Sequence, residues 1–225
     1  RKRNAAHRRL SSGCLASYSI SSEISDKRRQ MGIRAKTAAR LSRAVFLDRD
    51  GVINEIVDRG DNFSAKGKKV RFTAPFSYGE FKIKQGVKEV LEELKHLGFI
   101  RIIVTNQPDL TYGFLPKAEH ERITKDVLSL PVEDVFVCPH GREDGCQCKK
   151  PKPGMLLEAA GKWSIDLWRS YMIGDTENDI LAGKLAGCKT ILIRKPYSGN
   201  GGTPDFIAGS LSEAVRIIER LEKSS

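Results

Sequence analysis

The sequence predicts an α/β fold, a Rossmann-like three-layer sandwich in which helices cover both faces of a parallel sheet. Two observations lead to this prediction. Short apolar runs alternate with helix-length amphipathic segments along the chain, as in a succession of βαβ units. Several runs end directly in polar residues, which is typical of strands at the ligand-binding edge of a parallel sheet. The 225 residues suffice for one such domain, and no inserted stretch is long enough for a large cap domain.

Each element has its own signal. Short runs rich in Val, Ile or Leu predict strands at residues 44–47, 100–104, 132–137, 171–173 and 190–193, with 206–207 as a sixth candidate. Helices are predicted at residues 86–97, 117–129, 153–161, 177–186 and 211–221. In 86–97 the apolar residues follow three-four spacing and Gly98 is the stop signal. The stretch 54–81 is irregular, so we expect a long flap with one short strand at 70–73. Its lysines are expected either to meet a substrate or to face the solvent.

The formal net charge of +11 is concentrated at the N-terminus. Residues 1–43 carry 12 Lys and Arg against two acidic residues, which leaves 27 basic and 26 acidic residues in 44–225. We therefore predict a basic, disordered tail over 1–43 and a nearly neutral folded domain over 44–225. Three interpretations of the tail stay open: an organellar transit peptide, a polyanion-binding segment, or residues that precede a natural start at Met31.

The composition also bears on partners and compartment. Tyr18 is the only aromatic residue of the tail, so nucleic-acid bases would find little to stack on and nucleic-acid binding is disfavoured. No apolar run approaches the ~20 residues of a membrane span, so no membrane partner is expected. Three of the five cysteines cluster around one histidine, which indicates a metal site in a reducing compartment. We expect a cytoplasmic location, or an organellar one if the tail is a transit peptide.

The first predicted strand ends in two aspartates, Asp48 and Asp50, followed by Gly51. The glycine allows the backbone to turn away from the strand. Two carboxylates forced together repel each other unless a cation or a shared proton relieves the repulsion, and Mg²⁺ is the simplest such cation. A carboxylate beside Mg²⁺ can also attack phosphorus and form an aspartyl-phosphate. The alternative is a plain acidic turn, since the D-x-D-G pattern also occurs in hairpins and calcium loops.

Two other predicted strands end in polar residues that could complete this site. Thr105 and Asn106 follow the second strand, and Asp175 follows the fourth. Because the carboxyl ends of parallel strands share one edge, Asp175 can join Asp48 around Mg²⁺ while Thr105 and Asn106 donate to phosphate oxygens. Lys150, in the segment C-K-K-P-K-P-G-M, is our candidate for the cation that balances the charge of the phosphoryl group. Each feature alone also fits ordinary turn or capping chemistry.

A second candidate metal site lies just before that lysine. The spacing C-P-H-x5-C-x-C gives a Cys3His set made of Cys138, His140, Cys146 and Cys148. Zinc takes four such ligands in closed tetrahedral sites, so the predicted zinc ion shapes the loop and does not act on substrate. Free thiols that cluster by accident are the alternative interpretation. Cys188 lies in an apolar context and is expected in the core.

The chain resembles the haloacid-dehalogenase superfamily through four motifs: F-L-D-R-D-G-V-I-N, T-N-Q, C-P-H-x5-C-x-C-K-K-P-K-P-G-M and M-I-G-D-T-E-N-D. Within it, residues 44–222 most resemble the D-glycero-D-manno-heptose 1,7-bisphosphate 7-phosphatase family of carbohydrate and lipopolysaccharide metabolism, with the histidinol-phosphate phosphatase domain second. The resemblance implies a Mg²⁺-dependent phosphatase domain over 44–225, with Asp48 as nucleophile and Asp50 as general acid and then base.

The same resemblance implies further site residues. Mg²⁺ would be held by Asp48, Asp50 through its carbonyl, and Asp175, with Asp179 in support. The implied substrate-binding residues are Arg49, Thr105, Asn106, Gln107, Lys149 and Lys150. The implied partner is a small phosphorylated metabolite, and a monomer is favoured.

Three departures from the family pattern concern substrate recognition and leave the phosphoryl-transfer residues intact. T-N-Q-P-D-L stands where the family usually has T-N-Q-S-G-I, so Pro108 cannot donate a backbone hydrogen bond and Asp109 would sit poorly beside a second phosphate. Lys149 replaces the usual Arg and loses a bidentate clamp. The flap is longer than usual. The alternatives are therefore a phosphatase for histidinol phosphate or another small metabolite, or, in another class, an inactive binding protein with the same fold.

Overall fold

The computed structural model describes residues 41–199 and 202–224. The expectations for the N-terminal tail therefore fall mostly outside the described residues. Within the described part, Ser42 forms a bridge with Ile165, and Arg43 opens the first strand and forms an ion pair with Glu222. The sheet thus begins with Arg43, at the C-terminal end of the segment predicted as a tail.

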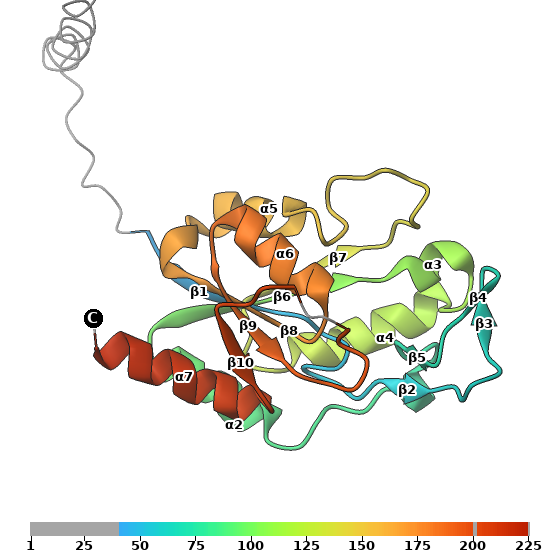
Figure 1. The fold of residues 1–225 in the computed structure, drawn as a ribbon, viewed down its shortest axis with the longest axis horizontal. Helices are drawn as coiled ribbons and strands as arrows, with labels where there is room; N and C mark the ends of the chain where they lie inside the picture. The colour runs from blue at the N-terminus through green and yellow to red at the C-terminus, as the bar shows by residue number, and fades with distance from the viewer. Residues whose placement is uncertain (1–40, 200–201, 225) are drawn as a thin grey trace, which may run out of the picture. The chain divides into compact units, whose positions relative to one another are not determined.

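A single parallel sheet of six strands forms the centre of the fold (Figure 1). The strands run in the spatial order β10-β9-β8-β1-β6-β7 and every neighbouring pair is parallel. Their bounds are β1 (Arg43–Leu47), β6 (Phe99–Asn106), β7 (Asp134–Cys138), β8 (Tyr171–Gly174), β9 (Lys189–Ile193) and β10 (Phe206–Ala208). All six predicted strands are present, and their ends differ from the prediction by at most two residues. The parallel α/β architecture expected from the sequence is confirmed.

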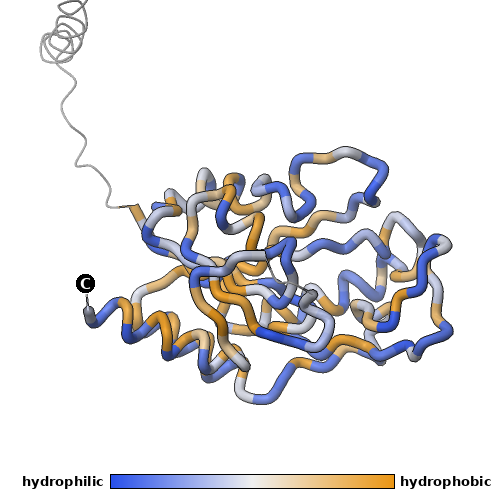
Figure 2. Tube along the Cα trace, in the orientation of Figure 1, coloured by the Kyte–Doolittle hydropathy of each residue, from blue (hydrophilic) through white to orange (hydrophobic). Residues whose placement is uncertain are grey.

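Helices cover both faces of this sheet and complete the three layers. They are α2 (Val87–His96), α4 (Lys117–Leu128), α5 (Gly154–Trp163), α6 (Glu177–Ala186) and α7 (Leu211–Lys223). Helices α2, α4 and α7 pack on one face, where β1 presents Val45 and Leu47. Helices α5 and α6 pack on the other face, where β1 presents Ala44 and Phe46. This alternation follows from the two-residue period of a strand and gives the sheet its continuously apolar strands (Figure 2).

The flap contains two small hairpins where one short strand at 70–73 was predicted, so that prediction was wrong in part. β2 (Val57–Asp58) pairs with β5 (Phe72–Thr73), and β3 (Ser64–Ala65) pairs with β4 (Lys68–Lys69). Strands of two residues are too short for an alternating pattern to show in the sequence. Arg59 joins the first and last parts of the flap, because it donates two hydrogen bonds to Glu80 in the 3₁₀ turn η1 (Tyr78–Glu80) and lies over the ring of Phe76.

A short helix that was not predicted, α3 (Pro108–Tyr112), follows β6 directly. Pro108 occupies its first turn, where a missing N–H leaves no hydrogen bond unmade. The missing backbone N–H of Pro108 therefore does not disturb helix α3. A further 3₁₀ turn, η2 (Leu167–Arg169), leads into β8. Among the described residues, no helix has the length and apolar character that crossing a bilayer requires.

Candidate active site

Three adjacent strands deliver polar residues to one edge of the sheet. β1 lies between β8 and β6, so Asp48 after β1 stands between Asp175 after β8 and Asn106 at the end of β6. One carboxylate oxygen each from Asp48, Asp175 and Asp179 lies within 4.8 Å of the other two, and the three residues are buried. The expected convergence of distant acidic residues at the carboxyl edge is therefore present.

One lysine compensates part of this negative charge. The ammonium of Lys150 lies 2.7 Å from Oδ1 of Asp48 and 2.5 Å from Oδ1 of Asp179, and it donates to the carbonyl of Val104 at 2.8 Å. Lys150 is only 3% exposed. Burial alone would lower the pKa of its ammonium, but the carboxylates of Asp179 and Asp48 outweigh it and the net shift is upward. Lys150 is therefore charged in this site and pairs with two aspartates at once.

A single ammonium does not balance three carboxylates. Burial raises the pKa of Asp175 to about 6, with a contribution from Asp179. Burial also raises the pKa of Asp48, against the opposing effect of Lys150. Oδ1 of Asp175 is buried and has no hydrogen-bond partner among the described residues. A donor set of carboxylate oxygens with one buried orphan oxygen fits a hard divalent cation such as Mg²⁺.

The turn after Asp50 is tightly packed against this cluster. Gly51 has a φ of 87°, and a Cβ at this position would fall 1.8 Å from Oδ2 of Asp175. Only glycine adopts this conformation readily and leaves room for the carboxylate. The prediction that Gly51 allows the backbone to turn is confirmed, and the structure adds a second reason, the close approach of Asp175.

The carboxylate of Asp50 is not part of the acidic cluster and accepts hydrogen bonds from several side chains. Arg49 donates to both of its carboxylate oxygens, at 2.9 and 3.0 Å. Nδ2 of Asn54 donates to Oδ1 at 3.0 Å, and Nε2 of Gln107 donates to Oδ2 at 2.6 Å. The hydroxyl of Thr105 lies 3.5 Å from Oδ2. Arg49, Thr105 and Gln107 are all buried, so the structure places these expected substrate-binding residues behind Asp50, where they fix its carboxylate.

Asn106 and Lys149 hold the segment that carries Lys150. The amide of Asn106 accepts from the backbone N–H of Lys150 at 3.0 Å and donates to its carbonyl at 3.1 Å. The ammonium of Lys149 donates to the carbonyl of His140 at 2.9 Å. Both side chains also line the main cavity. They are therefore placed to meet a ligand as well as to position Lys150.

A cavity of about 470 Å³ opens above the acidic cluster. Its walls come from the flap, α3, the cysteine-containing loop and the loop after β9, with Asp48, Asp50 and Asp175 at its base. Asp109 also lines this cavity, and no donor among the described residues reaches its carboxylate. Burial and the nearby Asp50 raise the pKa of Asp109 to about 6. Asp109 stands where the family usually has Gly, and it therefore places a carboxylate without a hydrogen-bond partner in the described part of the chain on the wall of this cavity.

The Cys3His set comes together beside this cavity. Sγ of Cys148 lies 3.2 Å from Nδ1 of His140 and 3.2 Å from Sγ of Cys138, and Sγ of Cys146 lies 3.7 Å from Sγ of Cys138. Ligands about 2.3 Å from a tetrahedral zinc ion stand about 3.8 Å apart, so the arrangement fits zinc. Lys152 donates to the carbonyls of residues 145 and 146 and holds the loop in place.

Two residues at this site carried no signal of their own in the sequence. The hydroxyl of Tyr197 donates to Oδ2 of Asp175 at 2.7 Å, and the hydroxyl of Ser198 donates to the carbonyl of Asp175 at 2.6 Å. Both lie in the loop after β9, at the same carboxyl edge as the other site residues. In the sequence, only the rule that loops at this edge bind ligands points to this loop.

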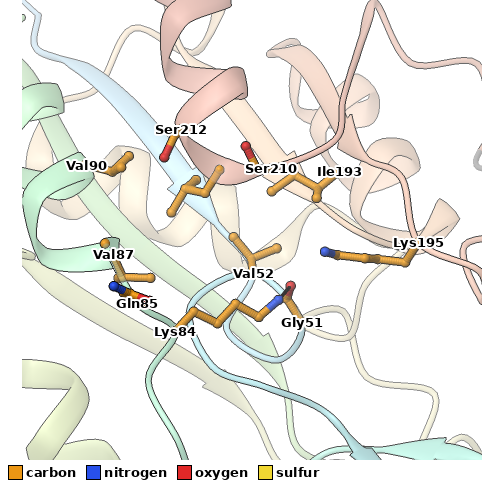
Figure 3. Close-up of a pocket in the computed structure, with 12 residues that line it drawn as sticks. Gly51, Val52, Lys84, Gln85, Val87, Val90, Ile193, Lys195, Ser210 and Ser212 are labelled. Carbon is orange, nitrogen blue, oxygen red and sulfur yellow. Dashed lines mark hydrogen bonds between the residues drawn. The ribbon is translucent and has the colours of Figure 1, made fainter.

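A second, smaller pocket of about 110 Å³ lies behind the turn at Gly51 (Figure 3). It is lined by the starts of α2 and α7 and by the end of β9. Lys84 donates to the carbonyl of Gly51 from this side. Burial and the neighbouring Lys195 lower the pKa of Lys84. The turn at Gly51 is therefore held on one side by Lys84 and on the other by the packing of Asp175.

Comparisons with known proteins identify related phosphatases. A HAD-hydrolase-like family model matches residues 147–214. The chain is 34% identical over 199 residues to D-glycero-β-D-manno-heptose-1,7-bisphosphate 7-phosphatase of Haemophilus influenzae, covering 81% of this chain and 100% of the relative. It is 31% identical to the Escherichia coli K12 protein of the same name, covering 80% and 95%.

A solved structure of a phosphatase of this kind also matches the fold of the chain. The crystal structure of D,D-heptose 1,7-bisphosphate phosphatase from B. bronchiseptica, complexed with magnesium and phosphate, superposes with a TM-score of 0.64 at 26% identity. The match covers 81% of this chain and 99% of that one. The similarity therefore extends over nearly the whole described domain.

Proposed function

Because the chain belongs to the D-glycero-β-D-manno-heptose-1,7-bisphosphate 7-phosphatase family of HAD-like hydrolases, we propose that it removes the 7-phosphate of heptose 1,7-bisphosphate. The observation that carries the proposal is the acidic cluster of Asp48, Asp175 and Asp179, paired with Lys150 at the base of a cavity large enough for a sugar phosphate. The same observation argues against an inactive binding protein, because a buried group of like charges is costly without a function.

In the proposed reaction Asp48 is the nucleophile. Its carboxylate attacks the phosphorus in line with the leaving oxygen, so a phosphorus–oxygen bond to the sugar breaks while an aspartyl-phosphate forms. Lys150 keeps its charge beside Asp48 throughout and offsets the negative charge that gathers on the phosphoryl oxygens. Magnesium, when bound by Asp48, the Asp50 carbonyl and Asp175, supplies further positive charge at the same place.

Asp50 is the proposed general acid and base. It gives a proton to the leaving alkoxide in the first step and takes one from the attacking water in the second. Arg49, Asn54 and Gln107 hold its carboxylate in place beside the cavity. We propose that Asn106, Lys149 and Lys150 contact the phosphate, and that Arg49, Thr105 and Gln107 act on it through Asp50.

The Cys3His cluster is proposed to hold a structural zinc ion that shapes the cavity wall. All four ligand positions are taken by protein atoms, so the ion has no open position for substrate. Thiols kept free for a metal require a reducing environment, and on this ground the cytoplasm is the proposed compartment. A small phosphorylated metabolite is the proposed partner, and a monomer the proposed state.

The test is phosphate release from heptose 1,7-bisphosphate, histidinol phosphate and p-nitrophenyl phosphate, with and without Mg²⁺. We expect Mg²⁺-dependent release that is fastest from the heptose bisphosphate and absent in Asp48→Asn. Asp58→Asn is the matched control, because Asp58 is an exposed flap carboxylate paired with Arg71. No release from any substrate would favour an inactive binding protein. Faster release from histidinol phosphate would reassign the substrate.

A further inference from the structure

Tyr197 makes the two oxygens of one metal-site carboxylate different from each other. Its hydroxyl donates to Oδ2 of Asp175 at 2.7 Å, while Oδ1 of Asp175 is buried without a hydrogen-bond partner among the described residues. When one carboxylate oxygen accepts a hydrogen bond and the other accepts none, only the second oxygen is free to bind a metal ion. Hydrogen-bond partners of this kind orient metal ligands in many sites.

The carboxylate of Asp175 has little freedom to move away from this arrangement. A Cβ at Gly51 would lie 1.8 Å from Oδ2 of Asp175 and 2.8 Å from the hydroxyl oxygen of Tyr197. The turn at Gly51, the carboxylate and the phenol therefore pack together without a gap. The hydroxyl of Ser198 fixes the backbone carbonyl of Asp175 at 2.6 Å. The position of Asp175 thus depends directly on where the loop after β9 holds Tyr197.

The same tyrosine also contacts the flap. Its ring packs against the ring of Phe72 in β5, with centroids 5.1 Å apart and planes tilted by 41°. β5 pairs with β2, and both rings line the main cavity. One side chain therefore touches the flap with its ring and the candidate magnesium site with its hydroxyl.

We propose that Tyr197 is a positioning residue that couples the flap to the magnesium site. Through its hydroxyl it sets the oxygen of Asp175 that faces the ion, and through its ring it responds to the position of Phe72. Such coupling is reciprocal: if flap packing strengthens metal binding, metal binding must order the flap by the same free energy. The inference rests on the proposed magnesium site.

The first experiment measures metal binding without turnover. Mn²⁺ is the probe, and free Mn²⁺ is followed by electron paramagnetic resonance in the full chain. We expect Tyr197→Phe, which keeps the ring and removes the hydroxyl, to weaken Mn²⁺ binding about tenfold or more. Tyr112→Phe is the matched control: Tyr112 lines the same cavity, but its hydroxyl donates to Glu143. The control should bind Mn²⁺ as the parent does.

The second experiment tests the link to the flap. Phe72→Ala should weaken Mn²⁺ binding in the parent and have no further effect in Tyr197→Phe, because without the hydroxyl the flap can no longer reach Asp175. Mg²⁺ should slow amide hydrogen exchange of residues 57–73 in the parent and lose this effect in Tyr197→Phe.

The outcomes separate the two proposals. Unchanged Mn²⁺ binding by Tyr197→Phe would overturn the positioning role. An equal effect of Phe72→Ala in both backgrounds would overturn the coupling. Failure of the parent to bind Mn²⁺ at all would overturn the metal site, and the proposed function with it.

Discussion

Replacing Lys150 by Met should destabilise the fold strongly, because it leaves two buried carboxylates without their cation. The ammonium of Lys150 lies 2.7 Å from Asp48 and 2.5 Å from Asp179, and both aspartates are buried. Removing one partner of a buried ion pair typically costs about 3–5 kcal/mol. The carbonyl of Val104 also loses its donor. We expect Lys150→Met to lower the free energy of unfolding by about 4 kcal/mol.

The assay is urea unfolding in Mg²⁺-free buffer at pH 7.5. At a slope of about 2–3 kcal/mol per M, the midpoint should fall by roughly 1.3–2 M. Added Mg²⁺ should recover part of the loss, since it supplies charge to the same carboxylates. The loss should also shrink toward pH 4, because burial raises the pKa of Asp48 and its carboxylate takes up a proton as the pH falls.

Lys162→Met is the matched control. Lys162 also pairs with an aspartate, Asp134, at 2.7 Å, but its side chain is 59% exposed. An exposed pair contributes about 1 kcal/mol or less. If Lys150→Met costs no more than Lys162→Met, then Lys150 is not the counter-charge of the acidic cluster.

Two further predictions concern the cavity wall. Burial raises the pKa of Asp109 from 3.8 to about 6, so ionisation of Asp109 lowers the free energy of unfolding. This loss of stability is absent below about pH 4, grows between pH 4 and 6 and is complete above pH 6. Asp109→Asn should therefore raise the melting temperature at pH 8 and leave it unchanged at pH 4, and an equal change at both pH values would contradict this assignment. Atomic spectroscopy should find about one zinc per chain, lost in Cys148→Ser and retained in Cys188→Ser, whose thiol lies outside the Cys3His cluster. Zinc retained by Cys148→Ser would remove that residue from the ligand set.

The sequence predicted those parts of the fold whose signal is local and long enough to read. The six strands stand out as short apolar runs and the five main helices as longer segments between them, and their alternation led directly to the parallel sheet. The flap hairpins could not be predicted because their strands have two residues each. The helix α3 was missed because Pro108 was considered only as a lost donor, although the first turn of a helix tolerates proline.

The site shows a similar division. The sequence predicts a shared site for Asp48, Asp175 and Lys150, because each follows a recognisable strand or motif. The ends of parallel strands lie at one edge of the sheet, which places these residues near one another. The orientation of individual side chains was not accessible in this way. Arg49, Thr105 and Gln107 have suitable chemistry for phosphate, yet tertiary packing turns them toward Asp50. Tyr197 joined the site only through the three-dimensional placement of its loop.

The most direct test of the account is to trap phosphate on the nucleophile. In Asp50→Asn with p-nitrophenyl phosphate, the good leaving group needs no acid, while the attacking water lacks its base. After rapid acid quenching and borohydride reduction, peptide mass spectrometry should find homoserine at position 48, the product expected from an aspartyl-phosphate. Release of nitrophenol with no modification of Asp48, or with modification of another residue, would contradict the mechanism.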